Sequence, residues 1–183
     1  MNTSAVLYTV SGRGQGNVDI SNNGTLLYMS ARPPLTRLVS VDRRGAARPL
    51  SEHVRQFSSA RVSPDGRRVA VTIGSPDRAV WTLDLGSGAL TRVTTGGFEQ
   101  RPEWTTDGAR LAWVELSEPR GVAWRPAEGG APERLLTTTG VSEISFGPPG
   151  TFLALRRGAL PALAGDLWIA PMDSPEELRP FAT

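Results

Sequence analysis

Cysteine and lysine are absent from this chain of 183 residues, and histidine occurs once. Without cysteine the chain forms no disulfide, has no thiol nucleophile and offers no thiolate to a metal. No segment approaches the ~18 consecutive apolar residues of a membrane span. The N-terminal stretch lacks the pattern of a signal peptide. The sequence therefore predicts no direct membrane insertion and leaves the compartment unassigned.

The basic side chains, 20 in number, are all arginine, and they stand against 18 acidic ones, for a net charge of +2. A nucleic-acid-binding protein gathers its basic side chains on one face. Here the arginine pairs fall at different points of the sequence repeat and alternate with acids, as at Arg43-Arg44, Arg67-Arg68 and Arg156-Arg157. The distribution predicts that nucleic acid is not a partner.

Four glycines, each 42 residues from the next, mark a repeat: Gly24, Gly66, Gly108 and Gly150. Each closes a turn, written SNNG, SPDG, TTDG and GPPG in one-letter code. An apolar residue stands four positions before each glycine, and two more stand three and five positions after it. A period of 40–45 residues with strand patterning is typical of propeller blades.

The repeat predicts an all-β fold, a β-propeller of four four-stranded antiparallel blades. The expected blades span about residues 15–50, 57–95, 98–138 and 140–183, within one domain over 1–183. Residues 5–10 are expected to form a leftover outer strand. The second strands, such as "VAVTI" and "LAWV", are apolar at successive positions. Strands that are buried on both faces show this pattern, so each blade is expected to lie between two others.

The segment "FSSARVSPDGRRVAVTIGSPDRAVWTLDLGSGALTRVT" resembles the TolB-like propeller repeat, which is WD-repeat-like. The segments "VAWRPAEGGAPERLLTT" and "GDLWIAPMDSPEELRPFAT" resemble repeats of propellers attached to bacterial serine/threonine protein kinases. The resemblance implies a ring of about six blades, of which this chain holds an incomplete part. It also implies a periplasmic or extracytoplasmic location. Open faces on the end blades predict self-association, because large exposed apolar patches promote it.

The sequence holds no catalytic motif of a kinase or of a serine peptidase: His-Arg-Asp, Asp-Phe-Gly and Gly-x-Ser-x-Gly are all missing. The chain is therefore expected not to be an enzyme itself. The favoured hypothesis is a scaffold for protein–protein or ligand binding, a sensor or interaction segment of a larger TolB-like or kinase-associated protein. The alternative is the substrate-gating propeller of a prolyl-oligopeptidase-like serine peptidase.

Binding residues concentrate on loops, and the loops at one end of propeller strands surround the central channel. We expect six charged or polar residues at this channel mouth: Arg55, Gln56, Glu99, Gln100, Arg101 and Glu143. No cofactor and no metal are expected. His53 lacks partners at a metal-binding spacing and is interpreted as a solvated loop residue. Asp65 and Asp107 are interpreted as turn formers, and the five tryptophans as core.

Overall fold

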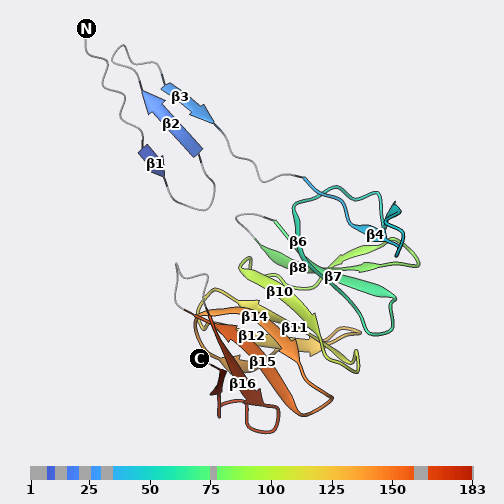
Figure 1. The fold of residues 1–183 in the computed structure, drawn as a ribbon, viewed down its shortest axis with the longest axis vertical. Coiled ribbons are helices and arrows are strands. Elements are labelled where there is room, and N and C mark those ends of the chain that lie inside the picture. The colour runs from blue at the N-terminus through green and yellow to red at the C-terminus, as the bar shows by residue number, and fades with distance from the viewer. Residues whose placement is uncertain are drawn as a thin grey trace. The chain divides into compact units, whose positions relative to one another are not determined.

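The structure, a computed structural model, describes residues 8–10, 16–20, 26–29, 35–74, 78–158 and 165–182. Every regular element in these ranges is a β-strand (Figure 1). The chain divides into two compact units, Met1–Leu35 and Thr36–Thr183. The all-β prediction is confirmed, and no helix of the described ranges is long and apolar enough to cross a membrane.

Three four-stranded antiparallel sheets follow one another along the second unit, and strand order in each sheet equals chain order. We call them blades two, three and four. Blade two has β6 Phe57–Val62, β7 Arg68–Ile73, β8 Ala79–Asp84 and β9 Leu90–Arg92. Blade three has β10 Glu99–Trp104, β11 Arg110–Glu115, β12 Gly121–Pro126 and β13 Glu133–Thr137. Blade four has β14 Val141–Phe146, β15 Phe152–Arg157, β16 Asp166–Pro171 and β17 Arg179–Ala182. Each sheet lies within the range expected for its blade.

Blade one differs from the expected four-stranded sheet. In the first unit, β1 (Tyr8–Val10), β2 (Gly16–Ile20) and β3 (Leu26–Met29) form a three-stranded sheet. In the second unit, β4 (Val39–Val41) pairs with β5 (Ala47–Pro49) alone.

Of the leftover outer strand expected over residues 5–10, the structure describes Tyr8–Val10 as β1, which is antiparallel to β2, with Tyr8 opposite Val18. Residues 5–7 lie outside the described ranges. That residues 1–183 form a single domain stays a prediction.

A hydroxyl and a carboxylate organise the turn between the first two strands of blades two and three. In blade two, Ser63 Oγ donates to Asp65 Oδ1 at 2.6 Å, and the same oxygen accepts from the Arg67 N–H at 3.0 Å. Thr105 and Asp107 repeat this arrangement in blade three, at 2.7 Å. The following glycine, Gly66 in blade two, has φ +71°, a left-handed conformation that glycine adopts without steric cost. The 42-residue spacing of Gly66 and Gly108 thus reflects a repeated turn geometry.

These turns predict a loss of stability in acid. The hydrogen bond from Ser63, then that from the Arg67 backbone, lowers the pKa of Asp65 below its usual 3.8. Thr105 and the Ala109 backbone lower the pKa of Asp107 in the same way. A lowered folded-state pKa contributes stability above the unfolded-state pKa, and this stability is lost as pH falls through the folded-state pKa.

We therefore expect the free energy of unfolding, measured in urea, to fall between about pH 5 and pH 2. In an Asp65→Asn/Asp107→Asn variant this fall should be shallower. The control is Asp173→Asn, which removes an exposed carboxylate after β16. If the free energy of unfolding falls equally steeply with pH in the double variant and the wild type, Asp65 and Asp107 are not the cause of the loss of stability in acid.

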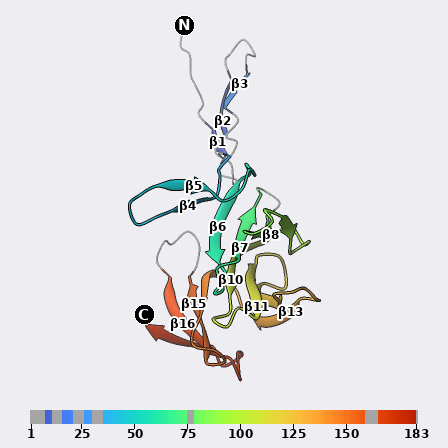
Figure 2. The same cartoon turned by 90° about the vertical axis from the view of Figure 1, so that its right-hand side faces the viewer.

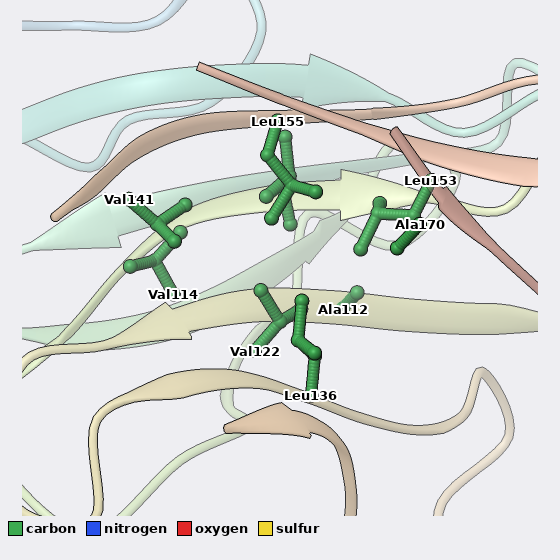
Figure 3. Close-up of a cluster of buried hydrophobic side chains, with 9 residues drawn as sticks. Ala112, Val114, Val122, Leu136, Val141, Leu153, Leu155 and Ala170 are labelled. Carbon is green, nitrogen blue, oxygen red and sulfur yellow. The ribbon is translucent and has the colours of Figure 1, made fainter. Parts of the chain in front are cut away.

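The second strands of blades two and three, β7 and β11, are buried on both faces, as the sequence predicts, whereas β15 of blade four alternates buried and half-buried residues. In β11, Leu111 and Trp113 belong to a cluster shared with blade two. Ala112 and Val114 belong to a cluster shared with blade four. That second cluster joins apolar residues of six strands (Figure 3): Ala112, Val114, Val122, Leu136, Val141, Leu153, Leu155 and Ala170. Successive residues of one strand therefore hold two neighbouring blades together.

The two ends of this stack of blades differ. Beside blade two lies the β4–β5 hairpin (Figure 2), and Leu38 and Leu50 pack against the buried Val69–Val71–Leu83 cluster of that blade. On blade four, Leu167 in β16 is 47% exposed. Val122 holds the equivalent position in blade three and is fully buried. The face of blade four that points away from blade three is thus the more open one.

Candidate binding site on the inner strands

The first strands of successive blades lie next to one another, with β10 between β6 and β14. Each pairs with the second strand of its blade through an irregular register. In β6 and β10 the irregularity coincides with a positive φ at Ser59 (+53°) and Arg101 (+56°). Non-glycine residues rarely adopt this conformation, and β-bulges re-aim side chains. The bulges therefore decide which side chains of these inner strands face one another.

Ion pairs join neighbouring inner strands at intervals of 42 residues. Arg61 Nε of β6 donates to Glu103 Oε2 of β10 at 2.7 Å. Arg101 Nη1 of β10 lies 3.8 Å from Glu143 Oε1 of β14. The same repeat that places equivalent strands side by side thus brings opposite charges together between blades.

Glu103 lies in the less solvated part of this site, since its side chain is 20% exposed. Burial raises the pKa of Glu103 above its usual value, and the Arg61 hydrogen bond and charge oppose that rise without cancelling it. The Glu103 carboxylate is therefore only partly compensated by its protein partner.

A pocket of about 300 Å³ opens beside these pairs. Its polar lining comes from three blades: Arg61, Glu103, Glu143, Ser145 and Arg156. Its apolar lining comes from blade four: Ile144, Ala154, Leu155 and Leu167. The arrangement offers charges of both signs next to an apolar wall, which is the composition of a small-molecule site.

Of the six residues expected at the channel mouth, the structure pairs Arg101 with Glu143 and places both at the surface. Glu143 also lines the pocket. Gln100 is half-buried and accepts a hydrogen bond from Arg78 Nη1. Arg55 is exposed, and its Nη1 donates to the Val54 carbonyl at 3.0 Å. The half-buried Gln56 contributes its backbone carbonyl to Gly74 N–H at 3.3 Å.

Glu99 is an internal carboxylate, because only 6% of the residue is exposed. Its Oε2 accepts from Thr94 Oγ1 at 3.1 Å and from the Gly97 N–H at 3.0 Å. A Cβ on Gly96 would lie 2.2 Å from the other carboxylate oxygen, so this glycine leaves room for the side chain. Glu99 therefore organises the loop between blades two and three instead of facing a ligand at the surface.

Sequence reasoning missed Arg61, Glu103, Ser145 and Arg156. Three of them share one repeat position, since 61, 103 and 145 are 42 apart and two residues beyond 59, 101 and 143. This spacing was a signal that could have found them. Arg156 carries no such mark, because its equivalents in the other blades are Thr72 and Val114.

The remaining candidates have structural surroundings. His53 is half-buried, with Nε2 3.3 Å from the Gly88 carbonyl oxygen, so it is less solvated than expected. Asp65 and Asp107 lie in turns, as expected. In the part of the chain that the structure describes, no group of three or more histidine or acidic side chains is placed to hold a metal.

A second hollow of about 150 Å³ lies between blades three and four at the opposite ends of the strands. Trp124 and Phe146 stack there, with ring centroids 6.3 Å apart, and the Arg110 guanidinium lies 4.4 Å from the Trp124 ring centroid. Arg110 also pairs with Glu133 at 3.0 Å. Because these side chains already contact one another, we interpret this hollow as a gap in the packing and not as a binding site.

Four-stranded antiparallel sheets that repeat every 42 residues and pack face to face define a β-propeller. No family model matches the sequence, and no curated protein matches it. Among solved structures, the chain is similar to TolB from Acinetobacter baumannii, with a TM-score of 0.63 and 14% identity over 98% of this chain and 52% of that one. For a putative TolB from Agrobacterium tumefaciens the TM-score is 0.59, with 15% identity over 96% and 59%.

A third similar structure is the β-propeller domain of the trilobed protease from Pyrococcus furiosus, with a TM-score of 0.50 and 17% identity over 69% of this chain and 42% of that one. At these identities the similarity shows the fold alone, and it confirms the predicted propeller. The chain spans little more than half the length of the two TolB chains.

Proposed function

We propose that this chain is a non-catalytic binding module. Its inner-strand surface, formed by the Arg61–Glu103 and Arg101–Glu143 pairs and the adjoining pocket, recognises a protein or small-ligand partner. One observation carries the proposal: charged side chains from the inner strands of three blades meet at one pocket of about 300 Å³. The sequence of the chain lacks the kinase and serine-peptidase motifs, so any kinase or peptidase activity would belong to a domain joined to this chain. Hydrolase or phosphotransferase activity in the purified chain would contradict the proposal.

The module is proposed to act as a sensor or interaction segment of a larger TolB-like or kinase-associated protein, outside the cytoplasm. The shorter length relative to the TolB chains supports this part. Its test is an immunoblot of the source cells with an antibody to this chain, whose own mass is 19.6 kDa. A band far above this mass supports a larger protein, and a band at this mass contradicts it.

Replacing both Arg101 and Glu143 with alanine is expected to abolish partner binding and leave the fold intact, because both side chains are well exposed, at 43% and 49%. Wild-type and variant chains would be cross-linked in lysate of the source cells, and captured proteins identified by mass spectrometry. A partner that depends on this pair would then be purified and titrated calorimetrically.

The matched control is Arg67→Ala/Glu128→Ala, which removes one charge of each sign at the opposite ends of the strands. It should bind like the wild type. If the captured proteins are the same for all three chains, the inner-strand surface is not the binding surface.

The alternative, a gate for a serine peptidase, is favoured by one observation, the similarity to the propeller of a protease. The two proposals differ in the gene. An α/β domain with Gly-x-Ser-x-Gly after residue 183 supports the gate, and a kinase domain before residue 1 supports the sensor.

A further inference from the structure

We infer that the inner-strand pocket binds a small zwitterion, a free α-amino acid with an apolar side chain. The inference rests on the proposed function, since it names the ligand class of the same surface. It is drawn from three features of the pocket: two carboxylates, two guanidinium groups and an apolar wall.

The carboxylates suit the ammonium end of such a ligand. Glu103 and Glu143 come from adjacent inner strands and line one pocket. Glu103 accepts a hydrogen bond from Arg61 Nε, whereas Arg61 Nη1 donates to the Ala60 carbonyl at 3.1 Å. Arg101 reaches Glu143 only at 3.8 Å, which is too long for a good hydrogen bond. Both carboxylates therefore retain acceptor capacity for an ammonium group.

Arginine side chains suit the carboxylate end: the Arg156 guanidinium lies in the lining, and Arg61 contributes Nη2, since its Nε and Nη1 donate to Glu103 and to the Ala60 carbonyl. An arginine presents a planar fork of N–H donors that matches a carboxylate. Because the lining carries two positive and two negative side chains, a ligand of one sign alone would meet repulsion as well as attraction. A zwitterion satisfies both signs.

The apolar wall favours an amino acid with a hydrocarbon side chain over glycine. Leu167 is 47% exposed and shares the lining with the half-buried Ala154. Covering exposed apolar surface is favourable by roughly 25 cal/mol per Å². The volume, about 300 Å³, is at the small end of the range for ligand sites, which suits a single amino acid.

Calorimetric titration of the full chain with L-leucine, N-acetyl-leucine, leucinamide and glycine tests the inference. Leucine should bind, and each of the other three should bind about tenfold more weakly or worse, because each lacks the ammonium, the carboxylate or the side chain. Failure of leucine to bind, or equal affinities for all four compounds, overturns the inference without any variant.

Two variants test which residue binds the ammonium group of the ligand and which binds its carboxylate. Glu143→Gln should weaken leucine and leucinamide about tenfold and change N-acetyl-leucine little. Arg156→Gln should weaken leucine and N-acetyl-leucine and change leucinamide little. Arg67→Gln, on an exposed turn, is the control and should match the wild type. Thermal unfolding followed by circular dichroism checks that each variant is folded.

The two proposals fail separately. If leucine does not bind but Arg101→Ala/Glu143→Ala still abolishes partner capture, only the ligand class is wrong. If leucine does not bind and capture is unchanged as well, the inner-strand surface has neither role.

Discussion

Leu155→Ala is expected to lower the free energy of unfolding by about 3 kcal/mol, within the usual range for a buried leucine. Leu155 is fully buried between blades three and four. Truncation removes its apolar contacts and leaves a cavity that close-packed neighbours on two blades fill only in part. Urea unfolding followed by circular dichroism at several protein concentrations measures the change.

Leu167→Ala is the matched control on the opposite face of the same blade. Because Leu167 is 47% exposed, its truncation should cost less than about 1 kcal/mol. A loss as large as that of Leu155→Ala would mean that this face is covered in solution. If the loss also depended on protein concentration, the cover would be a second copy of the chain, as the prediction of self-association through open blade faces requires.

Gly121→Ala is expected to destabilise the fold by about 3 kcal/mol or more, because it combines backbone strain with a steric clash. Gly121 begins β12 with φ +154°, and a Cβ there would lie 1.9 Å from the Leu136 carbonyl oxygen. Gly121 is opposite Thr137 in the ladder, so relief requires β12 and β13 to separate. The measurement is again urea unfolding, with the slope m checked for a change in cooperativity.

Gly66→Ala is the control that measures the backbone strain of a left-handed residue without a steric clash. Gly66 has φ +71° and no atom within 4 Å of a built Cβ. Its replacement should cost only about 1–2 kcal/mol, the price of a left-handed conformation for an L-residue. If Gly66→Ala and Gly121→Ala cost the same, the contact with Leu136 is relieved by a small local shift, and the expected clash is absent.

The sequence by itself determined the repeated parts of this fold. Strand formation over residues 57–182 follows from the 42-residue period, because each repeat carries its own turn signal and its own apolar strand. The turns at Ser63–Gly66 and Thr105–Gly108 have the geometry that their residues imply. In blades two and three, burial of the second strands on both faces follows from their unbroken apolar pattern. These features are local, or depend only on a blade having neighbours.

Features that depend on lateral contacts were decided by the tertiary structure alone. The partners Arg61 and Glu103 meet because bulges in the inner strands re-aim side chains, and no local signal marks a bulge at a serine or an arginine. The Glu99 side chain is buried and accepts hydrogen bonds from the Thr94 hydroxyl and the Gly97 N–H. The division of blade one between a three-stranded and a two-stranded sheet is likewise absent from the repeat pattern. Periodicity specifies that neighbours exist, whereas charge pairing and strand choice depend on the geometry with which those neighbours meet.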